Sequence, residues 1–134
     1  KINSKNGGLL IIDYGNLENH MFDSLQSVKN HKYGKILQNI GKSDITYRIN
    51  FKLLEKIFKN FNLKASNITN QKKFLLNLGI LSRAEIISKN LSFSKKANIY
   101  YRLKRLIDEK YMGNLFKVML ATKKSTYFNV GFEN

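Results

Sequence analysis

The chain has 134 residues, a length that fits one domain with a single core and excludes two independent ones. It contains no cysteine, which excludes disulfide scaffolds, thiolate metal sites and thiol nucleophiles, and no apolar run is longer than the four residues of 9–12, far fewer than the roughly 20 residues of a membrane span. The formal net charge of +15 would ordinarily favour a nucleic acid or an anionic surface as partner, but half of the residues are Lys, Asn, Ile, Phe or Tyr, whose codons are AT-rich, so part of the charge reflects codon composition.

The first predicted element is a strand over residues 9–12, which follows the glycine pair Gly7 and Gly8. Four bulky apolar residues without alternation are typical of a strand covered on both faces, as in the parallel sheet of an α/β protein. Ligands of such sheets bind beyond the carboxyl ends of the strands, so Asp13 and Tyr14 are the first candidate functional residues. The alternative role of Asp13 is to cap the turn after the strand, and the sequence does not decide between the two.

Residues 16–50 form the next segment, in which only residues 24–28 alternate like a short strand. About 35 residues without a long element often indicate a functional loop. Both histidines of the chain, His20 and His31, lie in this segment. They lack the i, i+4 spacing of a helical metal pair, so the sequence predicts no metal site, and each histidine on its own is more typical of a structural or surface residue than of a catalyst.

The remaining elements are predicted in the order helix, strand, three helices and strand. Their ranges are 51–61, 63–69, 71–78, 82–90, 95–110 and 116–122, with a last extended piece through 130–132. Asn50, Asn70 and Ser94 are the predicted N-caps, and Ser82 with Glu85 reads as a capping box. This alternation of strands and helices predicts an α/β architecture.

A complete nucleotide or cofactor domain of this class begins with a strand, a glycine-rich turn and a helix. Gly7 and Gly8 precede a strand instead of following one, so they cannot cradle a cofactor there. The sequence also lacks a phosphate loop, a serine nucleophile elbow and the close carboxylate pair of glycosidases. Taken alone, the pattern supports only the second half of an α/β domain.

Several separated blocks together resemble one family. They are residues 8–15 (GLLIIDYG), 23–26 with His31, 41–46 with Asn50 and Phe51, 71 with 74–75 and 78–80, 112–113 with 116–118, and 131–132. In this order and at these spacings, over nearly the whole chain, they resemble the MidA-like class I S-adenosyl-L-methionine-dependent methyltransferases. Mitochondrial members of that family help to assemble respiratory complex I by dimethylating an arginine of one of its subunits.

The resemblance implies an α/β fold, namely the second half of a Rossmann-like class I methyltransferase sheet, from its fifth strand to an antiparallel last strand, with added helices. Residues 1–134 would form the carboxyl-terminal part of the domain and supply the substrate-side wall of the cleft. The amino-terminal half, which binds most of the S-adenosyl-L-methionine, would be absent, and this fragment alone would be inactive. The implied partner is a protein substrate such as a complex I subunit, in the cytoplasm of a bacterium or the mitochondrial matrix of a eukaryote.

The resemblance also implies roles for individual residues. Asp13 and Asp44 become candidate catalytic residues, because carboxylates can hold an incoming arginine by charge-assisted hydrogen bonds. The candidate substrate-binding residues are Tyr14 and Gly15 at the strand end and His31 and Thr46 in the following loop. No residue of this fragment is assigned to the cofactor or to a metal.

Two positions depart from the family pattern, which usually reads Thr-x-His-Val-Asp-Phe where this chain has residues 46–51. Arg48 replaces the histidine, and a guanidinium stays protonated, so an acid–base role at that position is in doubt. Asn50 replaces the aspartate, and both residue types are good N-caps.

Two other functions remain open. One is a nucleic-acid-binding module, suggested by the charge and by Tyr100, Tyr101, Arg102, Lys104 and Arg105. We favour an ordinary helix whose tyrosines face the core and whose basic residues are solvated, because the sequence has no RNP, KH or helix-turn-helix pattern. The other is a non-enzymatic scaffold that binds a respiratory-chain subunit through residues 16–50. The sequence does not indicate the oligomeric state.

Overall fold

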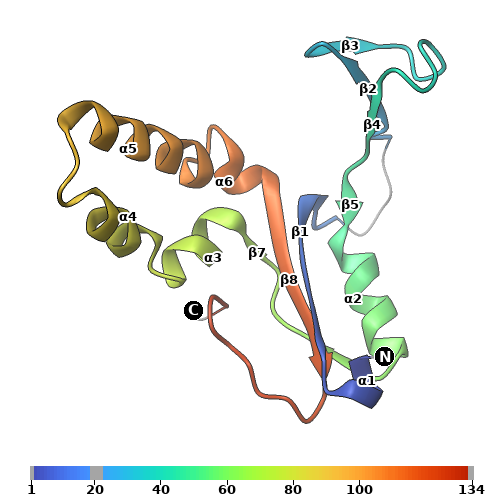
Figure 1. Cartoon of the computed structure of the whole chain (residues 1–134). Coiled ribbons are helices and arrows are strands. Elements are labelled where there is room, and N and C mark those ends of the chain that lie inside the picture. Colours follow the sequence, from blue (N-terminus) through green and yellow to red (C-terminus); the bar gives the residue numbers. More distant parts are fainter. Residues whose placement is uncertain (1, 19–22, 133–134) are drawn as a thin grey trace.

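The computed structural model describes residues 2–18 and 23–132, so His20 lies outside the described residues (Figure 1). In chain order the elements are α1 (Ile2–Lys5), β1 (Gly8–Asn16), β2 (Gln26–Lys29), β3 (Lys32–Gly34), β4 (Asp44–Thr46), β5 (Ile49–Asn50), α2 (Phe51–Asn60), β6 (Leu63–Ala65), β7 (Thr69–Asn70), α3 (Gln71–Asn77), α4 (Ile80–Ser88), α5 (Phe93–Ile107), α6 (Met112–Leu115) and β8 (Phe116–Lys123). The mixture of helices and strands expected from their alternation is confirmed, but the expected parallel sheet is not seen in the described residues, where only the short pairing of β1 with β5 is parallel.

The main sheet has the strand order β5-β1-β8-β6, and β7 also pairs with β8. β1 runs antiparallel to β8 from Gly8 to Tyr14, so the strand expected to be antiparallel to the others is present near the carboxyl terminus. On its other edge, β1 pairs with β5, in parallel, only at Gly15 and Asn16. Within the described part of the chain, residues 8–14 of β1 therefore have no strand along that edge.

The core lies on both faces of β8, because successive side chains of a strand point to opposite sides. One cluster contains Phe51, Phe58, Leu63, Met119 and Ala121 and involves α2, and the other contains Phe74, Val118 and Phe132 and involves α3. β1 is covered less completely, since Leu10 is 47% exposed and Ile12 is 44% exposed. The prediction of a strand covered on both faces is therefore wrong for β1 within the described chain, although the strand itself is confirmed.

Side-chain capping starts two of the helices. The side-chain oxygen of Asn50 accepts a hydrogen bond from the backbone N–H of Leu53 at 3.0 Å, and that of Asn70 accepts one from Lys73 at 2.8 Å. Both predicted caps are confirmed. They satisfy backbone donors that a helix cannot pair internally, which fixes where α2 and α3 begin.

The next two helices start earlier than predicted. Gly79 ends α3 in the left-handed region, with φ 76°, and α4 begins at the following residue, so Ser82 and Glu85 lie inside α4 and do not form a capping box at its start. The N-cap of α5 is Ser92, not Ser94, and this helix ends at Ile107. The start of α4 is set by Gly79 and not by the predicted capping box at Ser82, because the left-handed backbone of Gly79 turns the chain directly from α3 into α4.

Residues 26–46 contain a second, antiparallel sheet of three strands in the order β3-β2-β4, where the sequence predicted one short strand in an irregular segment. Asn30 and His31 connect β2 to β3, with φ angles of 50° and 61°. Two consecutive residues in this region are typical of the tight turns that match the twist of a hairpin. His31 thus has a structural role in this turn. The predicted strand at 63–69 is likewise two short strands, β6 and β7, both paired with β8.

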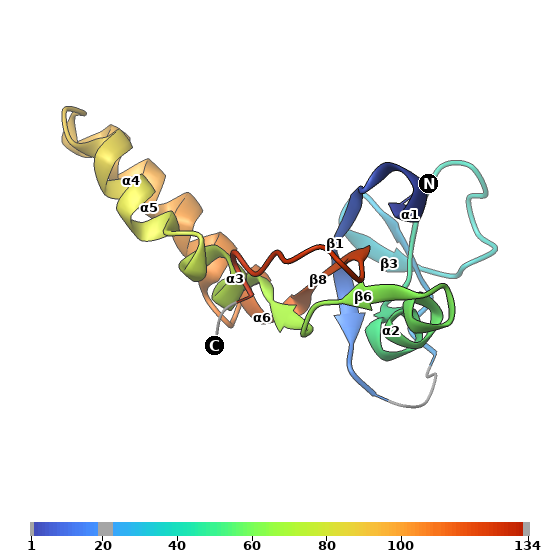
Figure 2. The same ribbon diagram turned by 90° about the horizontal axis from the view of Figure 1, so that it is seen from below.

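Helices α4 and α5 form a hairpin that extends away from the main sheet (Figure 2). Ala84 and Leu103 are buried in the hairpin. Tyr100 and Tyr101 are exposed, so the prediction that these tyrosines face the core is wrong. Among the described residues, no helix combines the length and the hydropathy that crossing a bilayer requires.

The chain ends in a segment that is not a strand within the described residues, in contrast to the predicted extended piece. Phe132 nevertheless belongs to the core, where its ring lies 5.2 Å from that of Phe74. The side-chain amide of Asn77 in α3 donates to the backbone carbonyl of Gly131 at 3.3 Å, which holds the segment against this helix.

Candidate functional site

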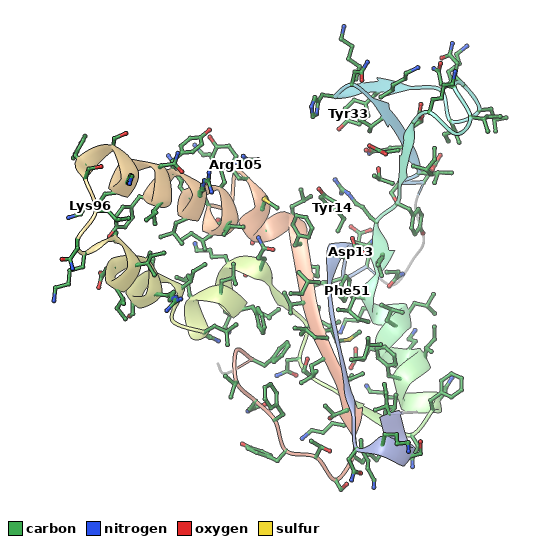
Figure 3. The ribbon with its side chains drawn as sticks, viewed as in Figure 1. Asp13, Tyr14, Tyr33, Phe51, Lys96 and Arg105 are labelled. Carbon is green, nitrogen blue, oxygen red and sulfur yellow. The ribbon has the colours of Figure 1, made fainter. Side chains whose placement is uncertain are left out.

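A cavity of about 370 Å³ lies where the end of β1 meets the three-stranded sheet. It is lined by Tyr14, Ser24, Gln26, Val28, Tyr33, Asp44, Thr46, Tyr47, Arg48 and Leu115. Figure 3 shows Tyr14 at the end of β1 and Tyr33 on the three-stranded sheet beyond it. The lining residues come from separate parts of the sequence, so the cavity depends on the tertiary fold.

A buried serine holds one wall of this cavity in place. The Oγ atom of Ser24 accepts a hydrogen bond from the backbone N–H of Arg48 at 3.1 Å. This bond ties the segment before β2 to the connection between β4 and β5. Because β5 in turn pairs with Gly15 and Asn16, this bond links the segment before β2, through β5, to the end of β1.

The structure brings together three of the six predicted site residues, since Tyr14, Asp44 and Thr46 all line the cavity. Strand alternation places Asp13 on the face of β1 opposite Tyr14, and its Oδ1 atom accepts a hydrogen bond from the backbone N–H of Tyr14 at 2.7 Å. His31 is exposed in the turn between β2 and β3 and does not line the cavity.

The remaining predicted residue, Gly15, packs against the core. A Cβ atom at this position would overlap the ring of Phe51, which is fully buried. The absence of a side chain at Gly15 therefore allows the start of α2 to approach β1 closely. This packing explains the glycine independently of any substrate.

Aromatic rings make up much of the cavity wall. The rings of Tyr14 and Phe116 lie 4.3 Å apart with their planes at 34°, which holds the tyrosine in place. Tyr33 and Tyr47 contribute two further rings to the lining. The faces of such rings attract planar cations such as a guanidinium.

Charges of both signs lie at the cavity. Asp44 contributes a carboxylate and Arg48 a guanidinium to the lining. Beside the cavity, burial lowers the pKa of Lys117, and the nearby charge of Arg48 lowers it further. The Nζ atom of Lys117 donates to the backbone carbonyl of Asn114 at 2.6 Å. A ligand carrying one positive and one negative group would find a partner for each in Asp44 and Arg48.

Sequence reasoning did not identify Ser24, Tyr33 or Tyr47 as members of this site. Tyr47 carried an available signal, since it lies between Thr46 and Arg48 in a block that the family resemblance already singled out. Ser24 likewise lies in the block 23–26 of the resemblance, whereas Tyr33 carried no signal, because its position depends on how β2 and β3 pair. In the described part of the chain, no group of three His, Cys, Asp or Glu side chains is placed to hold a metal ion.

Residues 1–69 match the model of the family described as "Putative S-adenosyl-L-methionine-dependent methyltransferase". The chain belongs to this family. The match includes β1, the three-stranded sheet and α2, and therefore all of the cavity lining except Leu115. The resemblance to MidA-like class I methyltransferases that the sequence blocks indicated is confirmed.

Two curated relatives in this family are mitochondrial. The protein arginine methyltransferase NDUFAF7 of Danio rerio is 29% identical over 117 residues, which cover 87% of this chain and 27% of the relative. The NDUFAF7 of Xenopus tropicalis is 27% identical over 126 residues, which cover 93% of this chain and 29% of the relative. The chain thus spans less than a third of the length of these relatives.

Two solved structures superpose on this chain and share its fold. A crystal structure of an uncharacterized protein from Burkholderia thailandensis superposes with a TM-score of 0.80 at 23% identity, covering 97% of this chain and 34% of that protein. A second structure from the same organism, bound to S-adenosyl-homocysteine, gives a TM-score of 0.74 at 23% identity and covers 96% of this chain and 33% of that protein. These superpositions support the expected class I methyltransferase fold for this chain.

Proposed function

We propose that this chain supplies the substrate-side wall of the cleft in an S-adenosyl-L-methionine-dependent methyltransferase that acts on an arginine of a protein. The observation that carries the proposal is the cavity, in which Tyr14, Asp44 and Thr46 meet from two separate blocks of the sequence. Family membership supports the reaction class, and the similarity to vertebrate protein arginine methyltransferases supports arginine as the acceptor. A complex I subunit is one substrate class that this proposal includes.

The described residues do not fit the cofactor by themselves. In the described part of the chain, no glycine-rich turn follows a strand, and the cavity lies beside the small sheet. We therefore assign most of the binding of S-adenosyl-L-methionine, which supplies the methyl group, to the portion of the relatives that this chain does not span. In that arrangement residues 1–134 form the carboxyl-terminal part of one methyltransferase domain.

The free edge of β1 supports this division of the domain. Residues 8–14 have no strand on the side away from β8 within the described chain, and Leu10 and Ile12 are exposed on one face of the strand. A strand of the cofactor-binding part would complete the hydrogen bonding at this edge and a covering element would bury the apolar side chains. In a longer polypeptide that contains both parts, hydrogen exchange in residues 9–12 should slow relative to the 134-residue chain, and equal exchange would contradict this assembly.

The residues of the cavity suit an arginine side chain. The carboxylate of Asp44 can accept charge-assisted hydrogen bonds from the guanidinium, and the ring of Tyr14 can pack against its plane. Asp13 acts through Tyr14, because its carboxylate is bonded to the backbone of that residue. The guanidinium of Arg48 would repel another cation, so we propose that it pairs with an acidic residue next to the target arginine of the substrate. The substrate role of His31 stays a prediction.

The test uses the longer polypeptide and labelled methyl transfer to a protein acceptor. Replacing Asp44 by Asn should lower kcat/KM roughly 10- to 100-fold, the worth of a hydrogen bond to a charged group, and leave cofactor affinity unchanged. Asp23→Asn is the matched control, since Asp23 is exposed outside the cavity lining and should keep full activity. Activity of Asp44→Asn equal to wild type would remove Asp44 from the site.

A separate substitution tests Asp13. Asp13→Ala in the same polypeptide should sharply lower methyl transfer and leave cofactor binding nearly intact, because the change affects the position of Tyr14 and not the cofactor-binding part. A parallel loss of cofactor affinity would place Asp13 in the cofactor site instead. Unchanged activity would show that Asp13 only caps the end of its strand.

A further inference from the structure

The far end of the α4–α5 hairpin is the second surface of interest. Figure 3 shows Lys96 near this end of α5, far from Tyr14 in β1 of the main sheet. We define residues 89–96, the connection after α4 and the first turn of α5, as the hairpin tip. It contains three lysines, Lys89, Lys95 and Lys96, and no acidic residue.

One aromatic side chain dominates the apolar surface of the tip. Phe93, the first residue of α5, is 88% exposed, the highest value among the exposed large apolar residues in the described chain. Ala97 and Tyr101 follow it at i+4 and i+8, and both are exposed. This spacing places the three residues on one helix face, whereas Leu103 on another face is buried. The outward face of α5 is therefore partly apolar and has no partner within the described chain.

The charge of α5 limits the kind of partner that this face can accept. The helix contains five basic residues and no acidic one, namely Lys95, Lys96, Arg102, Lys104 and Arg105. Figure 3 places Lys96 and Arg105 at different ends of the helix, so the positive charge extends along it. A second copy facing this helix would bring like charges together, which opposes self-association. An anionic partner complements the charge.

We propose that the hairpin tip docks on the surface of an anionic lipid bilayer. An aromatic ring at the apex can enter the headgroup layer while the lysines beside it reach lipid phosphates with their long side chains. Each lysine near such a surface strengthens binding about fivefold. A nucleic acid would match the charge, but it has no apolar layer for the ring at the apex. The tip is separate from the cavity, so this inference does not rest on the proposed function.

The chain contains no tryptophan, so a single introduced tryptophan reports its own surroundings. Phe93→Trp in the 134-residue chain should show a blue shift of emission with vesicles of three parts phosphatidylcholine and one part phosphatidylglycerol. Pure phosphatidylcholine vesicles should give little shift, and added salt should reverse the effect. Tyr33→Trp is the matched control, because Tyr33 is 79% exposed on the three-stranded sheet. A shift at position 33 equal to that at 93, or none at 93, would overturn the proposal.

Two further comparisons distinguish docking by the hairpin tip from contact through other parts of the chain. Ile12→Trp reports on the exposed face of β1, and a shift there without one at position 93 would mean that the chain binds vesicles through the sheet. The charge-reversal pair Lys89→Glu with Lys95→Glu should weaken binding more than about 25-fold, whereas Lys32→Glu with Lys42→Glu, an equal change of net charge in exposed residues elsewhere, should have a much smaller effect.

The nucleic-acid alternative is an outcome of the same assay. If a mixed-sequence oligonucleotide shifts or quenches the tryptophan emission of the Phe93→Trp variant near physiological salt and vesicles do not, the surface binds nucleic acid and the proposal is wrong. Far-UV circular dichroism of each variant shows whether the helices are intact, and equal spectra assign any loss of vesicle binding to the tip.

Discussion

Gly15 offers the sharpest test of the packing around the candidate site. A methyl group added by Gly15→Ala would overlap the ring of Phe51 and come within 3.0 Å of the backbone oxygen of Ile49. The ring cannot easily move away, because Phe51 is 0% exposed and belongs to the core cluster with Met119 and Ala121. Overpacking of this kind costs about 1–3 kcal/mol of the free energy of unfolding.

Urea unfolding followed by circular dichroism measures this free energy for a double-mutant cycle with Phe51→Leu. The smaller leucine leaves room for the added methyl, so Gly15→Ala should be much less destabilising in the Phe51→Leu background, with a coupling of about 1–2 kcal/mol. Gly34→Ala is the matched control, since a Cβ there meets nothing within 4 Å and should change stability little. Full additivity of the two substitutions would refute the packing argument.

Three further predictions concern α2 and the charges near the cavity. Asn50→Ala removes the N-cap of α2 and should lower the free energy of unfolding by about 1 kcal/mol, measured by urea unfolding, whereas Asn50→Asp should preserve stability. The hydrogen bond from Lys59 and the charges of nearby lysines hold the pKa of Glu55 below its ordinary value of 4.5, so this pair stabilises the fold above that pH and is lost as the pH falls through the lowered value. Glu55→Gln should thus destabilise by about 0.3–0.5 kcal/mol at pH 7, and the difference from wild type should vanish in acid. Burial and Arg48 both lower the pKa of Lys117, so Arg48→Gln should raise this pKa only partway to its ordinary value of 10.5, as followed by NMR titration of the lysine; an unchanged pKa would mean that Arg48 does not act on Lys117.

The features that could be predicted from the sequence are those that depend on neighbouring residues. Asn50 and Asn70 were recognisable caps because the hydrogen bonds they accept come from residues three positions away. The apolar runs of β1 and β8 were recognisable as strands for the same reason. Ser82 gave a wrong helix start, because the helix already begins after Gly79, three residues earlier.

The three-stranded sheet and the cavity could not be predicted in this way. Each strand of the small sheet has only three or four residues, and its pairing joins positions such as Ser27 and Ile45 that are far apart in the chain. The cavity wall depends on the bond between Ser24 and Arg48, which no local pattern encodes. Asp44 and Thr46, which the family resemblance singled out, nevertheless line this cavity, because a resemblance carries information about tertiary position that periodicity lacks.

The open edge of β1 also bears on how the chain behaves among its own copies. Residues 8–14 of β1 have no strand on the side away from β8 within the described chain, and such an edge beside exposed apolar side chains is a template onto which another strand can add, which is the first step of edge-to-edge aggregation. The net charge of +15 opposes this step by keeping copies apart at low ionic strength. Salt screens that repulsion but leaves the edge unchanged, so the abundant lysines act as a colloidal stabiliser of a sheet in which most of one edge of β1 has no neighbouring strand within the described chain.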